Sequence, residues 1–397
     1  MDDPVRFEVQ PAYRFEGQKT KIKAPKEIAY FSYDDERKYH PDCSSLSYYY
    51  PPPIPPEGID LSKGFEKFHQ LDDSNDEHLD SLLRTIMDLE KKDGHMCEAD
   101  VVTWRGMMTK IVTAPYDKFS EFEMNATKFQ VINEGSGRFI EEHHIRRDEE
   151  RNGLRHNGYS GNRFPPEMMS YWVAGYKFET LSVIPNIWDA VSRDTIEGRD
   201  EEVVNNYSQY CSVVRTAIGD NSLVIGGEVD AVWDEKPEDA DRAINWVELK
   251  TTEIFPPNDD RALLKFERKL LRMWAQSFLL NVPRLVIGFR DSGGRLHQIK
   301  ELETQRIPGI VKRKETIRRQ PCPWDAFGCL KFADDVLCWL RREIGEGIWR
   351  IRKRKGEGHI ELLKLTEEGP GRVLSEEFVQ WRRSDEFRSM QQTAAMQ

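Results

Sequence analysis

The chain has 397 residues, which is enough for one large domain or two ordinary ones. Hydrophobic residues make up 38% and charged residues 32%, while aromatic residues, at 11%, argue for a substantial core and against wholesale disorder. No apolar run reaches the roughly 18 residues of a membrane span, and the acidic N-terminus lacks the basic-then-apolar pattern of a secretory signal.

The cysteines and the charge distribution narrow the class of protein further. Six scattered cysteines form no CxxC pair, so neither a zinc site nor a disulfide framework is expected, and we expect a reducing compartment, cytosol or nucleus. The net charge of −11 argues against a protein that coats nucleic acid, but not against an enzyme that takes one nucleic-acid end into a pocket. The charge is uneven, since residues 306–355 carry 14 Lys/Arg and 6 Asp/Glu, a net +8.

In the first half of the chain, residues 1–30 are expected to be an irregular lead-in. The proline-rich segment 48–58 cannot be helix or central strand, and we interpret it as a rigid surface connection rather than a polyproline ligand. Leucine and isoleucine spacing predicts a helix over 77–92. Residues 101–117 are interpreted as a strand pair or a strand and a turn, and residues 171–184 as strand-like.

In the second half, the clearest local signal is a hairpin. Residues 223–233 and 243–252 are rich in β-formers and flank a polar loop with turn residues. A long amphipathic helix is predicted over about 260–280, with Asn258 or Asp259 as N-cap and Pro283 just past its end. A strand over 284–291 and a helix over 325–344 follow.

Strands come in pairs, with helices between larger blocks, which favours a mixed α/β (α+β) domain with antiparallel strands over a doubly wound sheet. No linker divides it, so we expect one catalytic domain over 31–380 and a polar, frayed tail over 381–397. Within it, the polar segment 141–163 is expected to be an exposed loop. The basic run 350–355 is interpreted as a solvated face, with nuclear import or an RNA-phosphate contact as alternatives.

The predicted hairpin carries the residues with the most chemical potential. Residues two apart in a strand share a face, so Glu228 and Asp230 point one way, as do Glu248 and Lys250. If the strands pair, three carboxylates and one ammonium converge. The opposite faces carry Val229, Val247 and Leu249. The alternative is a solvated sheet face with alternating acids and core residues.

Two observations favour a site over a solvated face. Gly226 and Gly227 leave room for a close approach just before the acids. Clustered acids on paired strands also repel one another, so a cation should compensate them, and Mg²⁺ and Mn²⁺ prefer oxygen ligands. Glu179, in another strand-like segment, could supply a fourth carboxylate or be an exposed strand acid.

This D…ExK layout suits metal-assisted hydrolysis of a phosphodiester or phosphoanhydride, in which the metal activates water and the lysine neutralises developing charge. Gln276 lies in an apolar stretch and is either a satisfied core amide or a ligand contact. Arg105 lies between apolar neighbours. It either forms a buried structural ion pair or binds a phosphate with its forked guanidinium group.

These pieces, in this order, resemble the decapping exoribonuclease (DXO/Rai-type) family. The matching stretches are FSYDDERKYH, YYYPPP, VVTWRGMMTKIVTAPYD, GYKFE, GGEVDAV, WVELKT and KFERKLLRMWAQSFLLNVPRLVIGFRD. They extend from about residue 31 to 291. The resemblance implies two central, mostly antiparallel sheets and a pocket related to D-(D/E)xK nucleases. It also implies hydrolysis at RNA 5′ ends: pyrophosphate from 5′-triphosphates, incompletely methylated caps, or NAD caps, and in some members 5′→3′ degradation.

The resemblance also assigns residues, a cofactor and a partner. It implies one or two Mg²⁺ or Mn²⁺ ions on Glu179, Asp230, Glu248 and the Leu249 carbonyl, with Glu228 acting through water. Lys250 and Gln276 would contact the scissile phosphate region. The substrate side would be formed by Trp104, Arg105, Gly106, Arg37, Glu77 and Cys211. The acidic N-terminus and basic C-terminal third resemble a fungal nuclear member that partners an Xrn-type 5′→3′ exoribonuclease.

Three functions therefore stand beside one another. The first is a metal-dependent RNA 5′-pyrophosphohydrolase and decapping enzyme. The second is a 5′→3′ exoribonuclease that uses the same motifs. The third is a binding module that stabilises a partner nuclease, although a protein without catalysis has no need of clustered acids.

Overall fold

A computed structural model describes residues 3–71, 76–131, 136–143, 166–239, 242–256, 258–318, 322–366 and 372–394. Only the backbone is described for residues 166–173 and 314–318. Of the expected exposed loop 141–163, only residues 141–143 lie within these ranges, and there the prediction is wrong, since Glu141 and Glu142 end strand β8 (Ser136–Glu142) and Glu141 is buried. No helix in the described residues is both long enough and apolar enough to span a bilayer.

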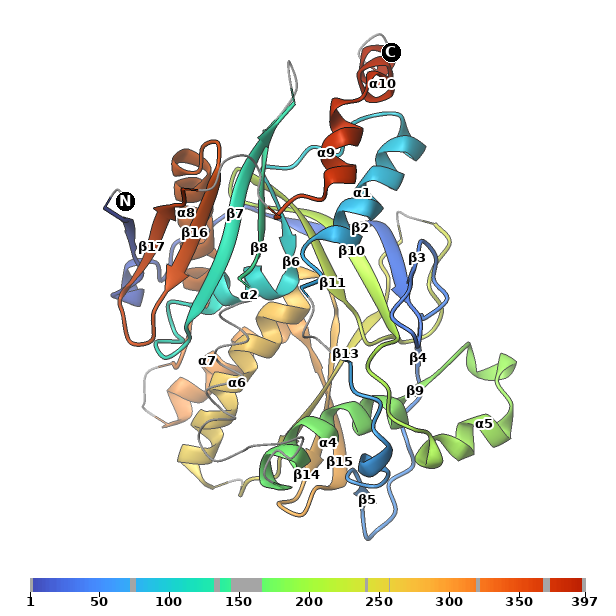
Figure 1. Cartoon of the computed structure of the whole chain (residues 1–397). Coiled ribbons are helices and arrows are strands. Elements are labelled where there is room, and N and C mark those ends of the chain that lie inside the picture. The colour runs from blue at the N-terminus through green and yellow to red at the C-terminus, as the bar shows by residue number, and fades with distance from the viewer. Residues whose placement is uncertain are drawn as a thin grey trace.

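The described chain folds into two mixed sheets with helices packed on and between them (Figure 1). The large sheet has the order β1-β17-β16-β7-β8-β6-β11-β10-β2-β3 and the small sheet the order β5-β15-β14-β13-β12-β4-β9. The large-sheet strands are β1 (Val5–Glu8), β2 (Ile22–Tyr33), β3 (Tyr39–His40), β6 (Val101–Trp104), β7 (Phe122–Gln130), β8 (Ser136–Glu142), β10 (Gln209–Ile218), β11 (Asn221–Glu228), β16 (Ile348–Lys353) and β17 (His359–Lys364). The small-sheet strands are β4 (Tyr48–Tyr49), β5 (Ile59–Asp60), β9 (Val183–Ile184), β12 (Ala231–Val232), β13 (Trp246–Glu253), β14 (Arg284–Arg290) and β15 (Arg295–Glu303).

The helices divide the hydrophobic interior into three clusters. The first joins both sheets through α2, α6 and α8, the second lies between the large sheet and α1 and α9, and the third lies between the small sheet and α4. The α-helices are α1 (Asp80–Asp93), α2 (Arg105–Thr113), α4 (Pro166–Ser182), α5 (Arg193–Glu197), α6 (Asp260–Leu279), α7 (Ile307–Arg318), α8 (Ala326–Glu343), α9 (Glu376–Arg383) and α10 (Asp385–Ala394). Short 3₁₀ helices are η1 (Ala12–Arg14), η2 (Phe65–Lys67), η3 (Trp188–Ala190), η4 (Gly198–Glu201) and η5 (Thr304–Arg306).

The mixed α/β class and the strongest element predictions are confirmed. Helices α1, α6 and α8 lie where the apolar spacing predicts them, and β14 matches the strand expected over 284–291. The Asp259 side chain caps α6 by accepting hydrogen bonds from the amides of Arg261 and Ala262.

The predictions for residues 171–184 and 101–117 are wrong. The strand-like segment 171–184 is mostly helix α4, because Ala174, Phe178 and Leu181 recur at helical spacing and pack on the small sheet. Residues 101–117 form strand β6 followed directly by helix α2 rather than a strand pair.

Both chain ends are more ordered than expected. Residues 22–30 belong to the long strand β2, although we expected residues 1–30 to be irregular. Within the expected frayed tail, α10 buries Phe387 against the second cluster. The preceding helix α9 is held by Glu90, whose carboxylate accepts hydrogen bonds from Trp381 and Arg382.

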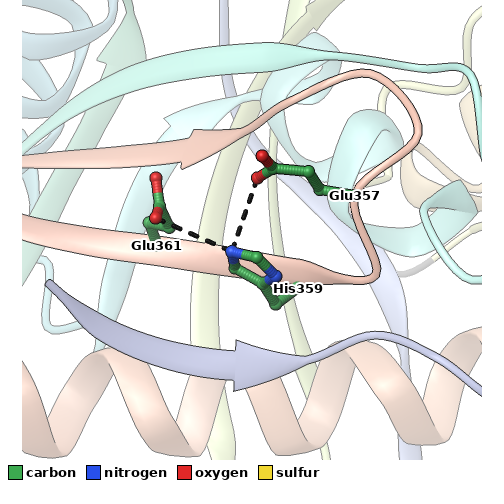
Figure 2. A group of neighbouring side chains, drawn as sticks. All are labelled: Glu357, His359 and Glu361. Carbon is green, nitrogen blue, oxygen red and sulfur yellow. Dashed lines mark ion pairs between the residues drawn. The ribbon is translucent and has the colours of Figure 1, made fainter.

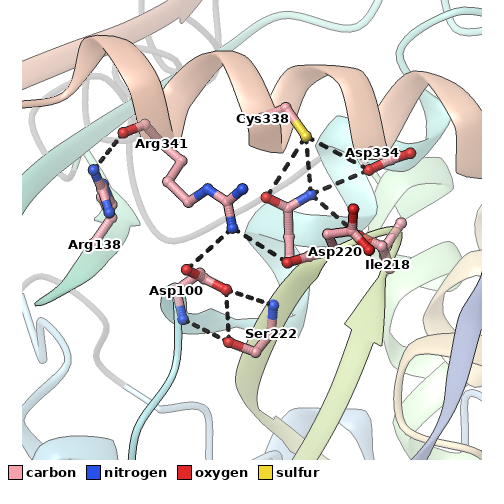
Figure 3. Close-up of polar contacts among 9 residues, drawn as sticks. Asp100, Arg138, Ile218, Asp220, Ser222, Asp334, Cys338 and Arg341 are labelled. Atoms are coloured by element: carbon pink, nitrogen blue, oxygen red, sulfur yellow. Dashed lines mark hydrogen bonds and ion pairs between the residues drawn. The ribbon is translucent and has the colours of Figure 1, made fainter. Parts of the chain in front are cut away.

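The turn between β10 and β11 is anchored by a polar network (Figure 3). Asp100 accepts hydrogen bonds from the Ser222 amide and hydroxyl and pairs with Arg341 of α8 at 3.2 Å. Asn221 donates to Asp334, also on α8. Because this end of β11 is fixed, its opposite end at Glu228 is held in a defined place.

Candidate active site

The chain crosses from one sheet to the other between Glu228 and Ala231. Strand β11 ends at Glu228 in the large sheet, and β12 begins at Ala231 in the small sheet. The predicted hairpin is therefore only partly correct, since Ala231 and Val232 alone pair with β13. The crossing matters for function because it places Glu228 and Asp230 at the junction of the two sheets, beside β13. We call Glu179, Glu228, Asp230 and Glu248, with the cations Arg105 and Lys250, the seam site.

The Gly226-Gly227 pair admits α2 to the seam, as its sequence position suggested. A Cβ at Gly226 would lie 2.7 Å from the Trp104 ring. A Cβ at Gly227 would lie 2.8 Å from the Arg105 Cβ and 2.9 Å from a Leu280 methyl group. Larger residues would therefore push Arg105 away from the carboxylates.

The two cations of the seam site contact its acids directly. Arg105 Nη1 donates to Glu248 Oε2 at 2.9 Å, and Lys250 Nζ lies 2.8 Å from Glu248 Oε1 and 3.7 Å from Asp230 Oδ2. Lys250 Nζ also donates to the Leu249 carbonyl at 3.0 Å. The Lys250 ammonium thus contacts three of the expected metal ligands. It compensates part of the negative charge of the carboxylates.

Strand alternation on β13 is as predicted. Val247 and Leu249 pack into the cluster under α4, while Glu248 and Lys250 face the other side. The Leu249 amide donates to Asp230 Oδ2 at 2.6 Å, which fixes that carboxylate against β13.

Glu179 joins the seam from helix α4 rather than from a strand. Its pKa is raised well above the usual range, first by burial and then by the charge of Asp230, while Lys250 acts in the opposite direction. The pKa of Tyr176, one turn earlier, is raised first by burial and also by the charges of Glu179 and Glu228. Glu179 therefore belongs to the same electrostatic unit as the acids from the sheets.

The remaining carboxylates differ in their tendency to ionise. Burial and the neighbouring Asp230 raise the pKa of Glu228 to about 7, and burial also raises the pKa of Asp230. Burial opposes ionisation of Glu248, but Arg105 and Lys250 outweigh it and lower its pKa. The carboxylates raise the pKa of Lys250 despite its burial, so the lysine is charged.

The donor set fits a divalent ion. Four carboxylates and two cations leave a formal charge of −2 when all are ionised, and one divalent ion would balance it. The buried Glu248 Oε1 accepts no hydrogen bond, although Lys250 is close. The neighbouring donors are carboxylate and carbonyl oxygens, which Mg²⁺ and Mn²⁺ prefer.

Arg37 and Glu77 are linked to the seam through a residue that the sequence did not indicate. Arg37 makes two hydrogen bonds of 2.8 Å to Glu77, and its guanidinium lies over the Tyr33 ring. Arg37 Nη1 donates to Gln209 Oε1 at 2.6 Å, and Gln209 Nε2 donates to Glu228 Oε2 at 3.2 Å. No local signal in the sequence distinguishes Gln209, because its contact with Arg37 depends on the pairing of β10 with the distant strand β2.

The other expected substrate residues surround the seam. Trp104 donates from its indole to the His78 carbonyl, and Gly106 is exposed, with open space where a Cβ would lie. Cys211 is buried and opposite Glu228 in the β10–β11 register, and burial raises the pKa of its thiol. Cys211 is therefore positioned beside the site but is not a reactive thiolate.

Gln276 lies on helix α6. It is half-buried and lies one turn before Leu280, a methyl group of which is 2.9 Å from where a Cβ of Gly227 would lie. Gln276 is therefore on the same side of α6 as Leu280.

A second acidic group lies on the hairpin between β16 and β17 (Figure 2). Glu357, His359 and Glu361 bring ligand atoms within 4.8 Å of one another, and among the described residues no other trio of possible ligands does so. Both Glu361 oxygens, however, already accept hydrogen bonds from Arg6 and Arg352. We call these three residues the hairpin cluster; its acids are balanced by arginine.

The basic run 350–355 is paired in the same region. Arg350 bonds to Glu123 and Asn125, Arg352 to Glu361, and Lys353 is buried and donates to the Ser120 carbonyl. The expectation of a solvated face is therefore wrong for Ile351 and Lys353, which are buried, and the contacts support a structural role more than an RNA-phosphate contact.

The proline-rich segment forms part of a cavity away from the seam. The cavity has a volume of about 840 Å³ and is lined by Pro52, Pro53 and Pro55 together with Trp188 and Arg199. None of the expected site residues lines it. The prolines are thus packed against the protein, as expected of a rigid surface connection. The expectation that no part of 48–58 is a central strand is wrong, because Tyr48 and Tyr49 form strand β4 between β12 and β9.

The fold and the seam site together define a divalent-metal-dependent nuclease. The sequence matches the family described as RAI1-like PD-(D/E)XK nuclease over residues 23–379, and the chain belongs to that family. The decapping nuclease RAI1 of Emericella nidulans is 49% identical over 382 residues, which cover 95% of this chain and 98% of that protein. The resemblance stated from the motifs is therefore confirmed.

Solved structures agree. Candida albicans Rai1 in complex with pU5 and Mn²⁺ has a TM-score of 0.84 at 30% identity, covering 96% of this chain and 99% of that one. Scheffersomyces stipitis Rai1 with 3′-NADP⁺ and calcium has a TM-score of 0.83 at 29% identity, with the same coverage.

Proposed function

We propose that this protein hydrolyses the 5′ ends of RNA. It removes pyrophosphate from 5′-triphosphate RNA and releases caps from incompletely methylated RNA, and it acts on NAD caps, in each case leaving 5′-monophosphate RNA. The observation that carries the proposal is the seam site, where four carboxylates face Arg105 and Lys250. The relatives named decapping nucleases, and the nucleotide and metal complexes of related structures, support it.

In this proposal Glu179, Asp230, Glu248 and the Leu249 carbonyl hold Mg²⁺ or Mn²⁺, and Glu228 acts through a water molecule. The metal supplies a Lewis acid and lowers the pKa of water. Glu228, whose pKa is raised to about 7 by burial and by Asp230, could accept a proton from a water molecule near neutral pH. Its hydrogen bond from Gln209 keeps the carboxylate oriented.

The cations of the seam act on the phosphate. Lys250 is held charged and stabilises the negative charge that develops on the transferred phosphoryl oxygens. Gln276 donates to the same region from α6. The RNA 5′ segment is held by Trp104, Arg105 and Gly106, with Arg37, Glu77 and Cys211 on the substrate side. Arg105 can both pair with Glu248 and contact phosphate, because a guanidinium has five donors.

The test is to incubate the chain with internally labelled 5′-triphosphate RNA, with and without Mn²⁺ or Mg²⁺, and to resolve the products. The proposal predicts metal-dependent release of pyrophosphate and full-length 5′-monophosphate RNA. Failure to release pyrophosphate from folded, metal-loaded protein would contradict it.

A 5′→3′ exoribonuclease activity is the second candidate. The complex of the Candida albicans relative with pU5 and Mn²⁺ favours it, since such a chain is the substrate of that reaction. A ladder of mononucleotides from 5′-monophosphate RNA would place this activity first.

We further propose a nuclear location and a protein partner, an Xrn-type 5′→3′ exoribonuclease that degrades the monophosphate product. The six free cysteines are consistent with a reducing compartment. Co-purification and the melting temperature of the partner test this role, and no gain in that temperature would count against it.

A further inference from the structure

We propose that Gln209 is a positioning residue that couples RNA held at Arg37 to the orientation of Glu228. The inference rests on the proposed function and adds a residue that links substrate binding to the seam site. Its basis is a continuous line of contacts from Glu77 through Arg37 and Gln209 to Glu228.

The first step is the orientation of the Gln209 amide. Arg37 has only donors, so the amide oxygen must face it, at 2.6 Å. The amide NH₂ is then directed to Glu228 Oε2, at 3.2 Å. The contact of the Gln209 amide oxygen with Arg37 therefore fixes the amide NH₂ group as the donor that faces Glu228.

The second step is the rigidity of the backbone that carries these groups. Gln209 pairs with Tyr33 in the β10–β2 register, and the Tyr33 ring supports the Arg37 guanidinium at 3.8 Å. Gln209 shares a strand face with Cys211, which is opposite Glu228. Arg37 itself has a φ of 64°, a conformation that non-glycine residues rarely adopt and that often marks functional sites.

The third step is the location of this line of contacts, which extends from solvent to the buried acids. The Glu77 side chain is 46% exposed, whereas the Glu248 side chain is 0% exposed. A phosphate or sugar oxygen that binds Arg37 competes with Glu77 and Gln209 for the same donors. RNA can thereby alter the hydrogen bond that Glu228 receives, so Gln209 affects turnover more than binding.

The experiment is a kinetic cycle on 5′-triphosphate RNA with Mn²⁺, using Gln209→Met, Arg37→Met and the double variant. The matched control is Gln298→Met, because Gln298 is an exposed glutamine on strand β15. We expect Gln209→Met to lower kcat about 10-fold or more, the scale of a hydrogen bond to a charged group, with KM within about 3-fold. In the double variant, Arg37→Met should raise KM but lower kcat no further.

A second variant separates the two ends of the amide. Gln209→Glu keeps an acceptor for Arg37 but places a carboxylate opposite Glu228, so kcat should fall at least as far with KM unchanged. Additive effects of Arg37→Met and Gln209→Met on kcat would overturn the inference. So would a change in KM alone, or a Gln209→Met variant that behaves like Gln298→Met.

An activity-independent measurement distinguishes failure of this inference from failure of the proposed function. In urea unfolding of the metal-free protein, Arg37→Met and Glu228→Gln should be non-additive in the wild-type background and additive in Gln209→Met. Additivity in both backgrounds would overturn the coupling, whatever the substrate. Non-additivity without pyrophosphate release would leave the coupling standing and refute only the proposed function.

Discussion

Two acidic clusters in this protein differ in how their charge is balanced. In the hairpin cluster, Glu361 is bound by Arg6 and Arg352, and Glu357 lies 3.8 Å from Arg354. In the seam site, four carboxylates share Arg105 and Lys250, and the pKa values of Glu179, Glu228 and Asp230 are raised. The hairpin cluster has the shorter spacing between ligand atoms, but the seam has the excess negative charge. We therefore propose the seam site, where the negative charge is not fully compensated, as the metal site rather than the hairpin cluster.

The largest expected effect comes from removing the excess negative charge of the seam site. Glu228→Ala combined with Asp230→Ala should lower hydrolysis of 5′-triphosphate RNA by about 1,000-fold or more, because several kcal/mol of metal-assisted stabilisation are lost. The melting temperature should stay the same or rise, since two repelling carboxylates are removed. Retained activity in this double variant, measured by pyrophosphate release, would refute the site assignment.

Lys250→Met should separate metal binding from chemistry. Activity should fall about 100-fold with loss of a charge that stabilises the transition state. Mn²⁺ affinity should rise several-fold, because Lys250 contacts three expected ligands and repels a second cation. Calorimetric titration measures the affinity, and a parallel fall in affinity and activity would contradict the account.

Metal should stabilise the folded protein by about 2.7 kcal/mol when present at 100 times its dissociation constant. The effect should grow as the pH rises through about 7, because Glu228 must lose its proton for a fully ionised site. Without metal, the stability of the folded protein should instead fall as the pH rises. The folded pKa of Glu228 is raised, so its stability contribution is present below the unfolded value and is lost as the pH rises toward 7.

Urea unfolding at pH 5.5 and 7.5, with EDTA or Mn²⁺, measures both trends. Glu228→Gln is the control, since it should flatten the metal-free pH dependence. A metal-free stability that rises with pH and is unchanged by Glu228→Gln would contradict the charge account.

The smallest effect is expected at the hairpin cluster. Glu361→Gln should cost about 2 kcal/mol of stability, since it weakens the hydrogen bonds from Arg6 and Arg352 to a buried carboxylate. Activity and Mn²⁺ stoichiometry should not change. Arginine contacts lower the pKa of Glu361 despite its burial, so its contribution should be lost only in acid, as the pH falls below the usual glutamate range. A loss of bound Mn²⁺ would mean that this cluster binds metal.

Sequence reasoning found the acids of the seam but not how they meet. Strand periodicity correctly separated Glu248 and Lys250 from Val247 and Leu249. The predicted hairpin was too long. The chain changes sheets after Glu228, but this segment is as rich in β-forming residues as one continuous strand would be. Glu179 was assigned to a strand because aromatic and β-branched residues surround it, whereas packing on the small sheet imposes helix α4.

More generally, the sequence could not predict which distant strands pair with one another. Strand β6 lies between β8 and β11 and is parallel to both, and no local pattern specifies those neighbours. The same limit concealed Gln209, whose significance comes from Arg37 in a distant segment and from Glu228 at the far end of the next strand. Residues with chemistry in their own motif were predictable, and residues that only connect motifs were not.

The most direct test of the central claim is to count bound Mn²⁺ by its electron paramagnetic resonance signal, since the signal of the free ion is lost on binding. Wild-type protein, the Glu228→Ala/Asp230→Ala variant and a Glu357→Gln/Glu361→Gln variant should be titrated side by side. The account predicts that the wild type and the hairpin variant bind the same number of ions, and that the seam variant loses them. Binding that persists in the seam variant and disappears in the hairpin variant would contradict the account.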